Sequence, residues 1–203
     1  MNEPPKIDGS TFLRERRARH PHFRAAVAAD ARFTCASRGE RHDLKPGLDT
    51  FAQAVRLAWV SDAFFGQVLY RLKARLQARG VPIVPRLLHR LAMASAQVSI
   101  GDPVIVQPGV YLVHGQVVID GLTEIGAGAV ISPWVTIGLR SGDFVGPTLE
   151  EGVTVGTGAK VLGRLTVGAS ARIGANAVVV EDVGAGETVL GIPAKPLKNS
   201  QEP

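Results

Sequence analysis

Residues 153–179 read VTVGTGAKVLGRLTVGASARIGANAVV, and an aliphatic residue returns in them at every sixth position. The same spacing connects Ile100, Val106, Leu112 and Val118 and, after a slip of one residue, Ile125, Ile131, Ile137, Leu149, Val155, Val161, Val167, Ile173 and Val179. Glycine follows many of them directly. A period of six fits neither the 3.6 of a helix nor the alternation of a flat strand, so the pattern indicates a repeat architecture.

This period predicts a parallel β-helix in which each hexad is one short strand and its corner. The aliphatic side chain points into a narrow core, and glycine fits the crowded corner. Earlier in the chain, the apolar pattern predicts one helix from Thr50 that ends at Gly80, and a shorter helix over residues 84–94. The predicted fold is mainly β, with an α-helical N-terminal domain (1–97), a β-helix (98–196) and a flexible tail (197–203).

The order of motifs carries a resemblance to a known family. The motifs are Leu-Val-His-Gly-Gln-Val-Val-Ile at 112–119, Val-Thr-Ile-Gly at 135–138, an irregular stretch at 139–148, Gly-Thr-Gly-Ala-Lys-Val-Leu-Gly at 156–163, Ile-Gly-Ala-Asn-Ala-Val-Val at 173–179 and Gly-Ile-Pro-Ala-Lys at 191–195. This order resembles the left-handed β-helix of hexapeptide-repeat acyltransferases and is most similar to the serine acetyltransferase family. The resemblance reaches back through Tyr70-Arg71 and covers roughly the last two-thirds of the chain.

Composition and charge narrow the class of protein. The single Cys35 excludes an intramolecular disulfide and fits a reducing compartment. We expect a cytoplasmic protein without stable membrane insertion, because the sequence shows no charged-then-apolar leader and no apolar run long enough to cross a bilayer. Residues 1–99 carry 17 lysines and arginines against 8 acids, whereas residues 100–203 carry 6 against 10. The helix that ends at Gly80 carries Arg71, Lys73, Arg75 and Arg79. We interpret this basic helix as a solvated or intersubunit face and expect no nucleic-acid partner, since no nucleic-acid motif accompanies it.

His114 is the candidate catalytic residue, because it is the one histidine of the repeat region and interrupts the apolar pattern. The resemblance implies that it acts as general base. A neutral imidazole, dominant at neutral pH, would take the proton from an acceptor hydroxyl as that oxygen attacks a thioester carbonyl.

Several positions depart from the family pattern. Ser99 stands where the family carries the aspartate that orients the base, so Asp102, Asp120 and Asp143 are the candidates for that role. The family's loop motif Asp-Arg-His-Pro is here Asp143-Phe-Val-Gly-Pro147, without its arginine and histidine. An acidic substrate-binding position of the family's N-terminal domain falls near Ala52, with Asp49 the closest carboxylate. These departures leave the acceptor open.

For the donor, the resemblance implies acetyl-CoA in a groove between adjacent subunits of a homotrimer, or of a dimer of trimers. The backbone amides of Thr157 and Ala175 match positions that hold the pantetheine arm, and Lys195 and Arg172 are candidates for its phosphates. The sequence shows no phosphate-binding Gly-Lys-Ser/Thr loop and no metal-ligand spacing, so we expect no metal.

The predicted function is therefore acetyl-CoA-dependent O-acetylation of a small molecule, with serine or a related amino acid as the acceptor. Two alternatives remain open at this point. One is acetylation of a sugar hydroxyl of a polysaccharide precursor. The other is a non-catalytic trimeric scaffold, which the missing substrate-contacting groups would favour.

Overall fold

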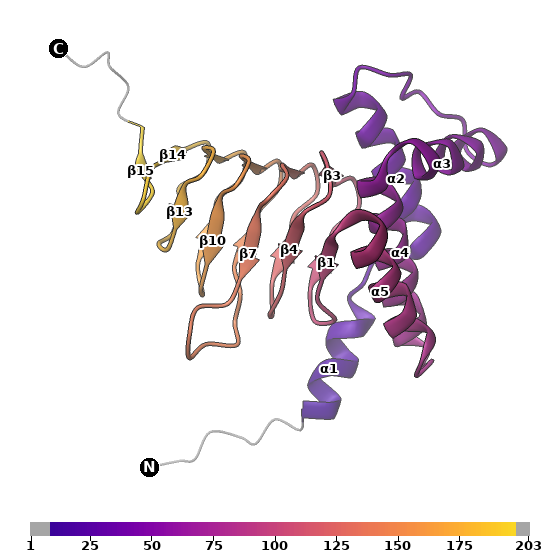
Figure 1. Cartoon of the computed structure of the whole chain (residues 1–203), viewed down its shortest axis with the longest axis horizontal. Helices are drawn as coiled ribbons and strands as arrows, with labels where there is room; N and C mark the ends of the chain where they lie inside the picture. Colours follow the sequence, from indigo (N-terminus) through magenta and orange to yellow (C-terminus); the bar gives the residue numbers. More distant parts are fainter. Residues whose placement is uncertain (1–8, 198–203) are drawn as a thin grey trace.

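The computed structural model describes residues 9–197, in which a group of helices precedes a series of short strands. The helices are α1 (Gly9–Ala18), α2 (Phe23–Ser37), α3 (Leu48–Val60), α4 (Asp62–Ala78) and α5 (Val84–Ala96). Figure 1 shows them gathered at one end of the β-helix, while the strands continue away from them toward the C-terminus. Of the predicted tail 197–203, residues 198–203 lie outside the described residues.

The strands are two or three residues long and form three sheets, the faces of a prism. Face A contains β1 (Val98–Ile100), β4 (Val117–Ile119), β7 (Thr136–Gly138), β10 (Lys160–Leu162) and β13 (Val178–Val179). Face B contains β2 (Ile105–Val106), β5 (Glu124–Ile125), β8 (Thr148–Leu149) and β11 (Thr166–Val167). Face C contains β3 (Tyr111–Leu112), β6 (Val130–Ile131), β9 (Thr154–Val155), β12 (Arg172–Ile173), β14 (Thr188–Leu190) and β15 (Lys195–Pro196).

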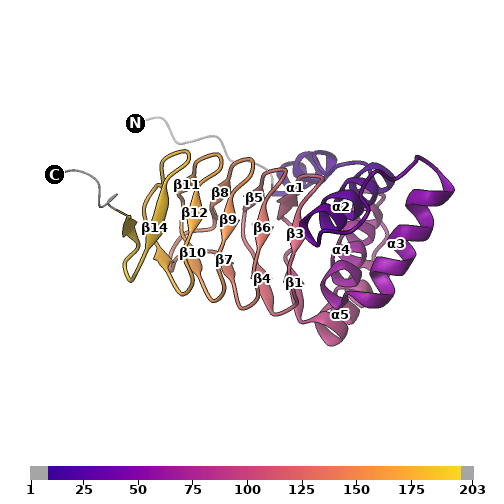
Figure 2. The same ribbon diagram turned by 90° about the horizontal axis from the view of Figure 1, so that it is seen from above.

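Neighbouring strands within each face are parallel, and only β14 and β15 pair in the antiparallel sense. The coils therefore stack along one axis, as Figure 2 shows from above. This arrangement confirms the predicted fold class, a left-handed parallel β-helix preceded by helices.

The inward aliphatic side chains build the core that the hexad period predicts. Ile125, Ile131, Ile137, Val155 and Val161 are completely buried. Each such side chain contributes about 1.5–3 kcal/mol of burial free energy, so a long, thin prism can be stable without aromatic residues in its interior.

The extra residue in the hexad repeat, predicted after Val118, lies one hexad earlier in the structure, so its predicted position was wrong. Val118 is 43% exposed, whereas its neighbours Val117 and Ile119 are buried. The pairing of Ile100 with Ile119 shows that the extra residue lies before β4, in the corner at residues 113–116. That corner has four residues between buried Leu112 and Val117. The equivalent corner of the next coil, between buried Ile131 and Val135, has three.

The predicted long helix is two helices. Ser61 has extended backbone angles and its Oγ accepts a hydrogen bond from Phe64 N at 3.3 Å, which caps α4. A serine before an aspartate is a favourable helix start. The interruption at Ser61 turns α4 toward the first coil.

Side chains of α4 cover the open end of the β-helix. The first coil has no coil beneath it, and β1, β2 and β3 are edge strands of their sheets. Their backbone groups would otherwise be left unpaired. The oxygen or nitrogen atoms of four α4 side chains donate to carbonyls of this coil: Gln67 to Val110 at 3.0 Å, Tyr70 to Val104 at 2.8 Å, Arg71 to Gln107 at 2.7 Å and Lys73 to Ile100 at 2.6 Å.

A buried ion pair fixes this arrangement. Arg71 Nε lies 2.9 Å from Asp30 Oδ2 of α2, and both side chains are almost fully buried. Asp30 Oδ1 also accepts hydrogen bonds from the amides of Gly109 and Val110, at 2.8 and 3.2 Å. The interpretation of the basic helix as a solvated or intersubunit face was therefore wrong for Arg71 and Lys73. Both cations are buried and bind backbone oxygens of the first coil.

Arg71→Met should lower the free energy of unfolding by about 3–5 kcal/mol, because it leaves Asp30 charged, buried and unpaired. Urea titration measures the change. Arg79→Met, at an exposed position just after α4, is the control and should stay within about 0.5 kcal/mol of the parent. Equal stability of the two variants would contradict the assigned role of the ion pair.

His20 should make the protein acid-sensitive. Burial, together with the charges of Arg71 and Lys73, lowers the pKa of His20 from 6.5 to about 4. The unfolded chain therefore binds a proton more readily than the folded one, and the free energy of unfolding should fall by up to about 3 kcal/mol as pH decreases from 6.5 to 4. Urea titrations across this range should show that His20→Leu removes this part of the slope, whereas His42→Leu, at an exposed site, keeps it.

Candidate active site

His114 lies in the enlarged corner between β3 and β4 and is exposed. The corner rests directly on the end of α5. Gln116 N donates to Ala96 O at 3.2 Å, and Val117 N donates to Gln97 O, also at 3.2 Å. Among the described residues, no side chain is hydrogen-bonded to the His114 ring. The ring is therefore available to a ligand.

A cavity of about 520 Å³ adjoins this corner. Its wall is formed by the corner itself, the end of α5, the start of α4 and Arg38 at the end of α2. Asp62, the first residue of α4, is the one carboxylate among the lining residues. Arg38 contributes a positive charge and is paired with Glu40, whose carboxylate also pairs with Arg56. The cavity thus offers both signs of charge beside a histidine.

The two predicted amide donors lie along the same edge of the prism as His114. This edge, called the C–A edge here, consists of the corners that lead from face C to face A. Successive corners are joined by hydrogen bonds from Trp134 N to Gln116 O (2.8 Å), Gly158 N to Pro133 O (3.0 Å) and Asn176 N to Thr157 O (2.8 Å). Among the described residues, the amides of Thr157 and Ala175 donate to no other backbone group. Both remain free for a ligand lying along the edge.

The irregular segment predicted at residues 139–148 protrudes from the opposite edge of face A. It follows the end of β7, whereas His114 precedes the start of β4, and the two strands are parallel. Figure 1 shows this segment extending beyond the other corners. Asp143 Oδ1 accepts a hydrogen bond from Val145 N within the segment, at 2.9 Å. One chain therefore does not bring Asp143 and His114 together.

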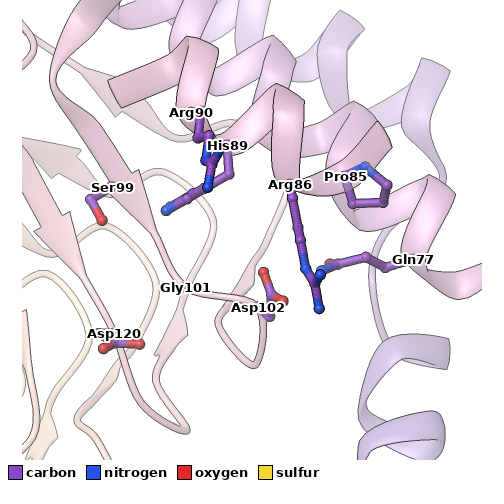
Figure 3. A pocket seen from close by; sticks show the side chains of 9 residues that line it. All are labelled: Gln77, Pro85, Arg86, His89, Arg90, Ser99, Gly101, Asp102 and Asp120. Carbon is purple, nitrogen blue, oxygen red and sulfur yellow. The ribbon is translucent and has the colours of Figure 1, made fainter. Parts of the chain in front are cut away.

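The other two candidates for orienting His114, together with Ser99, face a different cavity. Ser99, Asp102 and Asp120 line a space of about 360 Å³ between α5 and the first two coils, shown in Figure 3. Asp102 and Asp120 follow the ends of β1 and β4, on the far side of face A from His114. Asp102 is paired with Lys73, whose Nζ lies 3.0 Å from Oδ1. Within one chain, neither carboxylate is placed to orient the His114 ring.

The two candidates for phosphate binding lie near the C-terminal end. Arg172 is exposed on β12 of face C. Lys195, on β15, has its Nζ 3.7 Å from Glu181 Oε2, and both side chains are largely exposed. Within residues 9–197, no group of three or more His, Cys, Asp or Glu side chains is arranged to hold a metal ion. No helix in that range is long and apolar enough to cross a membrane.

Arg38 and Asp62 were not predicted from the sequence. Both are more than fifty residues from His114 in the chain, and no periodic pattern connects them to it. The usable signal was Ser61-Asp62, which begins α4 and places Asp62 in its first turn.

Gly115→Ala should disrupt the His114 corner, because a Cβ at this position would overlap the carbonyl oxygen of Ala96. Overpacking of this kind costs about 1–3 kcal/mol, measurable by urea titration. Gly138→Ala is the matched control, since its Cβ would have Asp120 O as its nearest neighbour at 3.6 Å, an ordinary contact. It should change stability by less than about 1 kcal/mol. A tolerated Gly115→Ala would show that the corner can move away from α5.

Comparison with known proteins gives the family. No family model matches the chain. The serine acetyltransferase of Helicobacter pylori strain J99 is 42% identical over 132 residues, 63% of this chain and 77% of the relative. That of Synechococcus elongatus is 37% identical over 154 residues, 69% of this chain and 63% of the relative, so the chain spans slightly less than two-thirds of it. A solved serine acetyltransferase in complex with CoA superimposes with a TM-score of 0.69 at 25% identity, covering 84% of this chain and 68% of that one. The chain therefore belongs to the serine acetyltransferase family of hexapeptide-repeat acyltransferases.

Proposed function

We propose that the protein transfers an acetyl group from acetyl-CoA to the hydroxyl of a small acceptor, with His114 as general base. The observation that carries this proposal is the C–A edge. It combines an exposed histidine that has no hydrogen-bond partner within residues 9–197, two backbone amides further along that are free in the same range, and a charged cavity at the histidine end. Acyl transfer requires these three features: a base, a binding site for the donor and a binding site for the acceptor.

The donor would lie along the C–A edge. The amides of Thr157 and Ala175 would hydrogen-bond the pantetheine arm and bring the thioester to the His114 corner. Because these contacts involve the backbone, the threonine side chain at 157 does not hinder them. Arg172 and Lys195 would meet the phosphates, since both cations are exposed. The solved family member in complex with CoA supports this choice of donor.

The acceptor would occupy the cavity of His114. Arg38 would hold a carboxylate and Asp62 an ammonium group, which places an amino-acid hydroxyl beside the imidazole. The relatives' name, serine acetyltransferase, points to serine. Charges of both signs in this cavity favour an amino acid over the alternative, a neutral sugar hydroxyl. His114 would take the proton as the oxygen attacks the thioester carbonyl, and CoA would leave as the thiol.

The site would be completed by a neighbouring subunit in a homotrimer. The protruding segment 139–148 and His114 lie at opposite edges of face A, so a second subunit is needed to bring such a segment to the His114 cavity. A threefold arrangement supplies one such contact to every subunit.

His114→Ala should lower the turnover number for acetyl-CoA and serine by about 10²–10⁴-fold, because general-base assistance is of that magnitude. Release of the CoA thiol measures turnover, and calorimetric titration with CoA should show nearly unchanged affinity. His22→Ala, at an exposed position at the opposite end of α2 from Arg38, should keep full activity. Full activity of His114→Ala would place the base elsewhere. The absence of thiol release from the parent protein with any amino acid or sugar would refute the proposed reaction.

A further inference from the structure

The cavity shown in Figure 3 is not used by the proposed transfer reaction, although it is lined by many ionisable groups. It has a volume of about 360 Å³, within the range of small-molecule sites. Its helical wall is the first half of α5, from Pro85 to Arg90, together with Gln77 of α4. The opposite wall is formed by Ser99, Gly101, Asp102 and Asp120 of the first two coils. It opens on the side of face A away from His114.

The positive charges of this cavity have no carboxylate partner. Arg86 and Arg90 are four residues apart on α5 and both are exposed. Among the described residues, neither lies within ion-pair distance of an acid. Figure 3 shows Arg90 beside His89, extending toward the coil that carries Ser99. Both guanidinium groups are therefore free to bind an anionic group.

The negative charges are held in place by the coils. Asp120 Oδ1 accepts a hydrogen bond from Gly121 N at 2.7 Å, and no cation in the described chain pairs with it. Asp102 is anchored by buried Lys73. Burial alone would raise the pKa of Asp102, but hydrogen bonding from Gln77 and the charge of Lys73 together lower it. Asp102 is thus charged at neutral pH.

Two further groups line the same space without a charge of their own. Burial and the charge of Lys73 lower the pKa of His89, so its ring is neutral at neutral pH. The Oε1 atom of Gln77 is buried and has no hydrogen-bond partner in the described chain. An unpaired buried amide oxygen is costly unless a donor reaches it.

We propose that this cavity binds a small zwitterion of amino-acid size, at a site separate from the His114 cavity. Its carboxylate would pair with Arg90 and Arg86, and its ammonium group would lie against Asp120 and Asp102. A simple anion would meet two carboxylates and a simple cation two guanidinium groups, so a ligand with both charges is favoured. The proposal is independent of acetyl transfer, because none of these residues has a role in the proposed reaction.

Histidine ring resonances in NMR spectra locate the ligand, since His89 lines this cavity and His114 lines the other. The probes are glycine, β-alanine and γ-aminobutyrate, which separate the two charges by increasing distances. Propylamine and butyrate are the controls with a single charge. At least one zwitterion should shift the His89 resonance saturably, and each control should bind at least about tenfold more weakly.

Arg90→Gln and Asp120→Asn should each weaken this binding by roughly tenfold or more, while Arg79→Gln, outside the cavity, leaves it unchanged. The Asp120→Asn side chain keeps its shape and its oxygen acceptor for Gly121 N, and circular dichroism verifies that each variant is folded. Three results would overturn the proposal. They are an unmoved His89 resonance with every probe, butyrate or propylamine binding as tightly as the zwitterion, and undiminished binding in both variants. A shift of His114 alone would place the ligand in the other cavity and also refute it.

Discussion

The Arg71–Asp30 ion pair holds the helices against the first coil at the open end of the β-helix. A stack of parallel coils satisfies its backbone groups everywhere except at its ends. Here the first coil is paired by side chains instead, and Asp30 accepts from its amides while Arg71 donates to its carbonyls. A buried ion pair is tolerated only when its remaining hydrogen bonds are satisfied. The backbone of the coil supplies them, so the helices and the coil each complete the other.

This constraint also shapes the candidate active site. With α4 fixed on the first coil, the end of α5 lies against the corner that contains His114, close enough that only glycine fits at position 115. The extra residue of this corner interrupts the hexad and exposes the imidazole. The same packing places Asp62 and Arg38 around the resulting cavity. The charged cavity at the head of the C–A edge is thus a consequence of how the helices cover the coil.

Much of this could be predicted from the sequence, because the β-helix is a local repeat. Each hexad specifies one strand and one corner, so the β-helix follows from spacing, whereas His114, Thr157 and Ala175 were singled out by the family resemblance and only the structure places them on one edge. The displaced slip at Val118 shows the limit of that reasoning, since the sequence Val117-Val118-Ile119 allows either register and only the stacking on Ile100 decides it. The burial of Arg71 and Lys73 could not be predicted from composition. The sequence of a basic helix face is the same whether its cations are solvated or bind carbonyl oxygens. The contacts of Arg38 and Asp62 with the site depend on helix packing, which has no periodic signal.

In the proposed reaction, acyl transfer occurs on the C–A edge and the protruding segment of a neighbouring subunit completes the site. Mixed oligomers test this shared site. His114→Ala subunits are co-expressed with subunits in which residues 140–146 are deleted, and thiol release is measured on the purified mixed complex. We predict that each variant alone is nearly inactive, while the mixture regains activity because some sites combine an intact His114 with an intact neighbouring segment. A mixed complex that stays inactive, or a deletion variant that is fully active alone, would contradict a site shared between subunits.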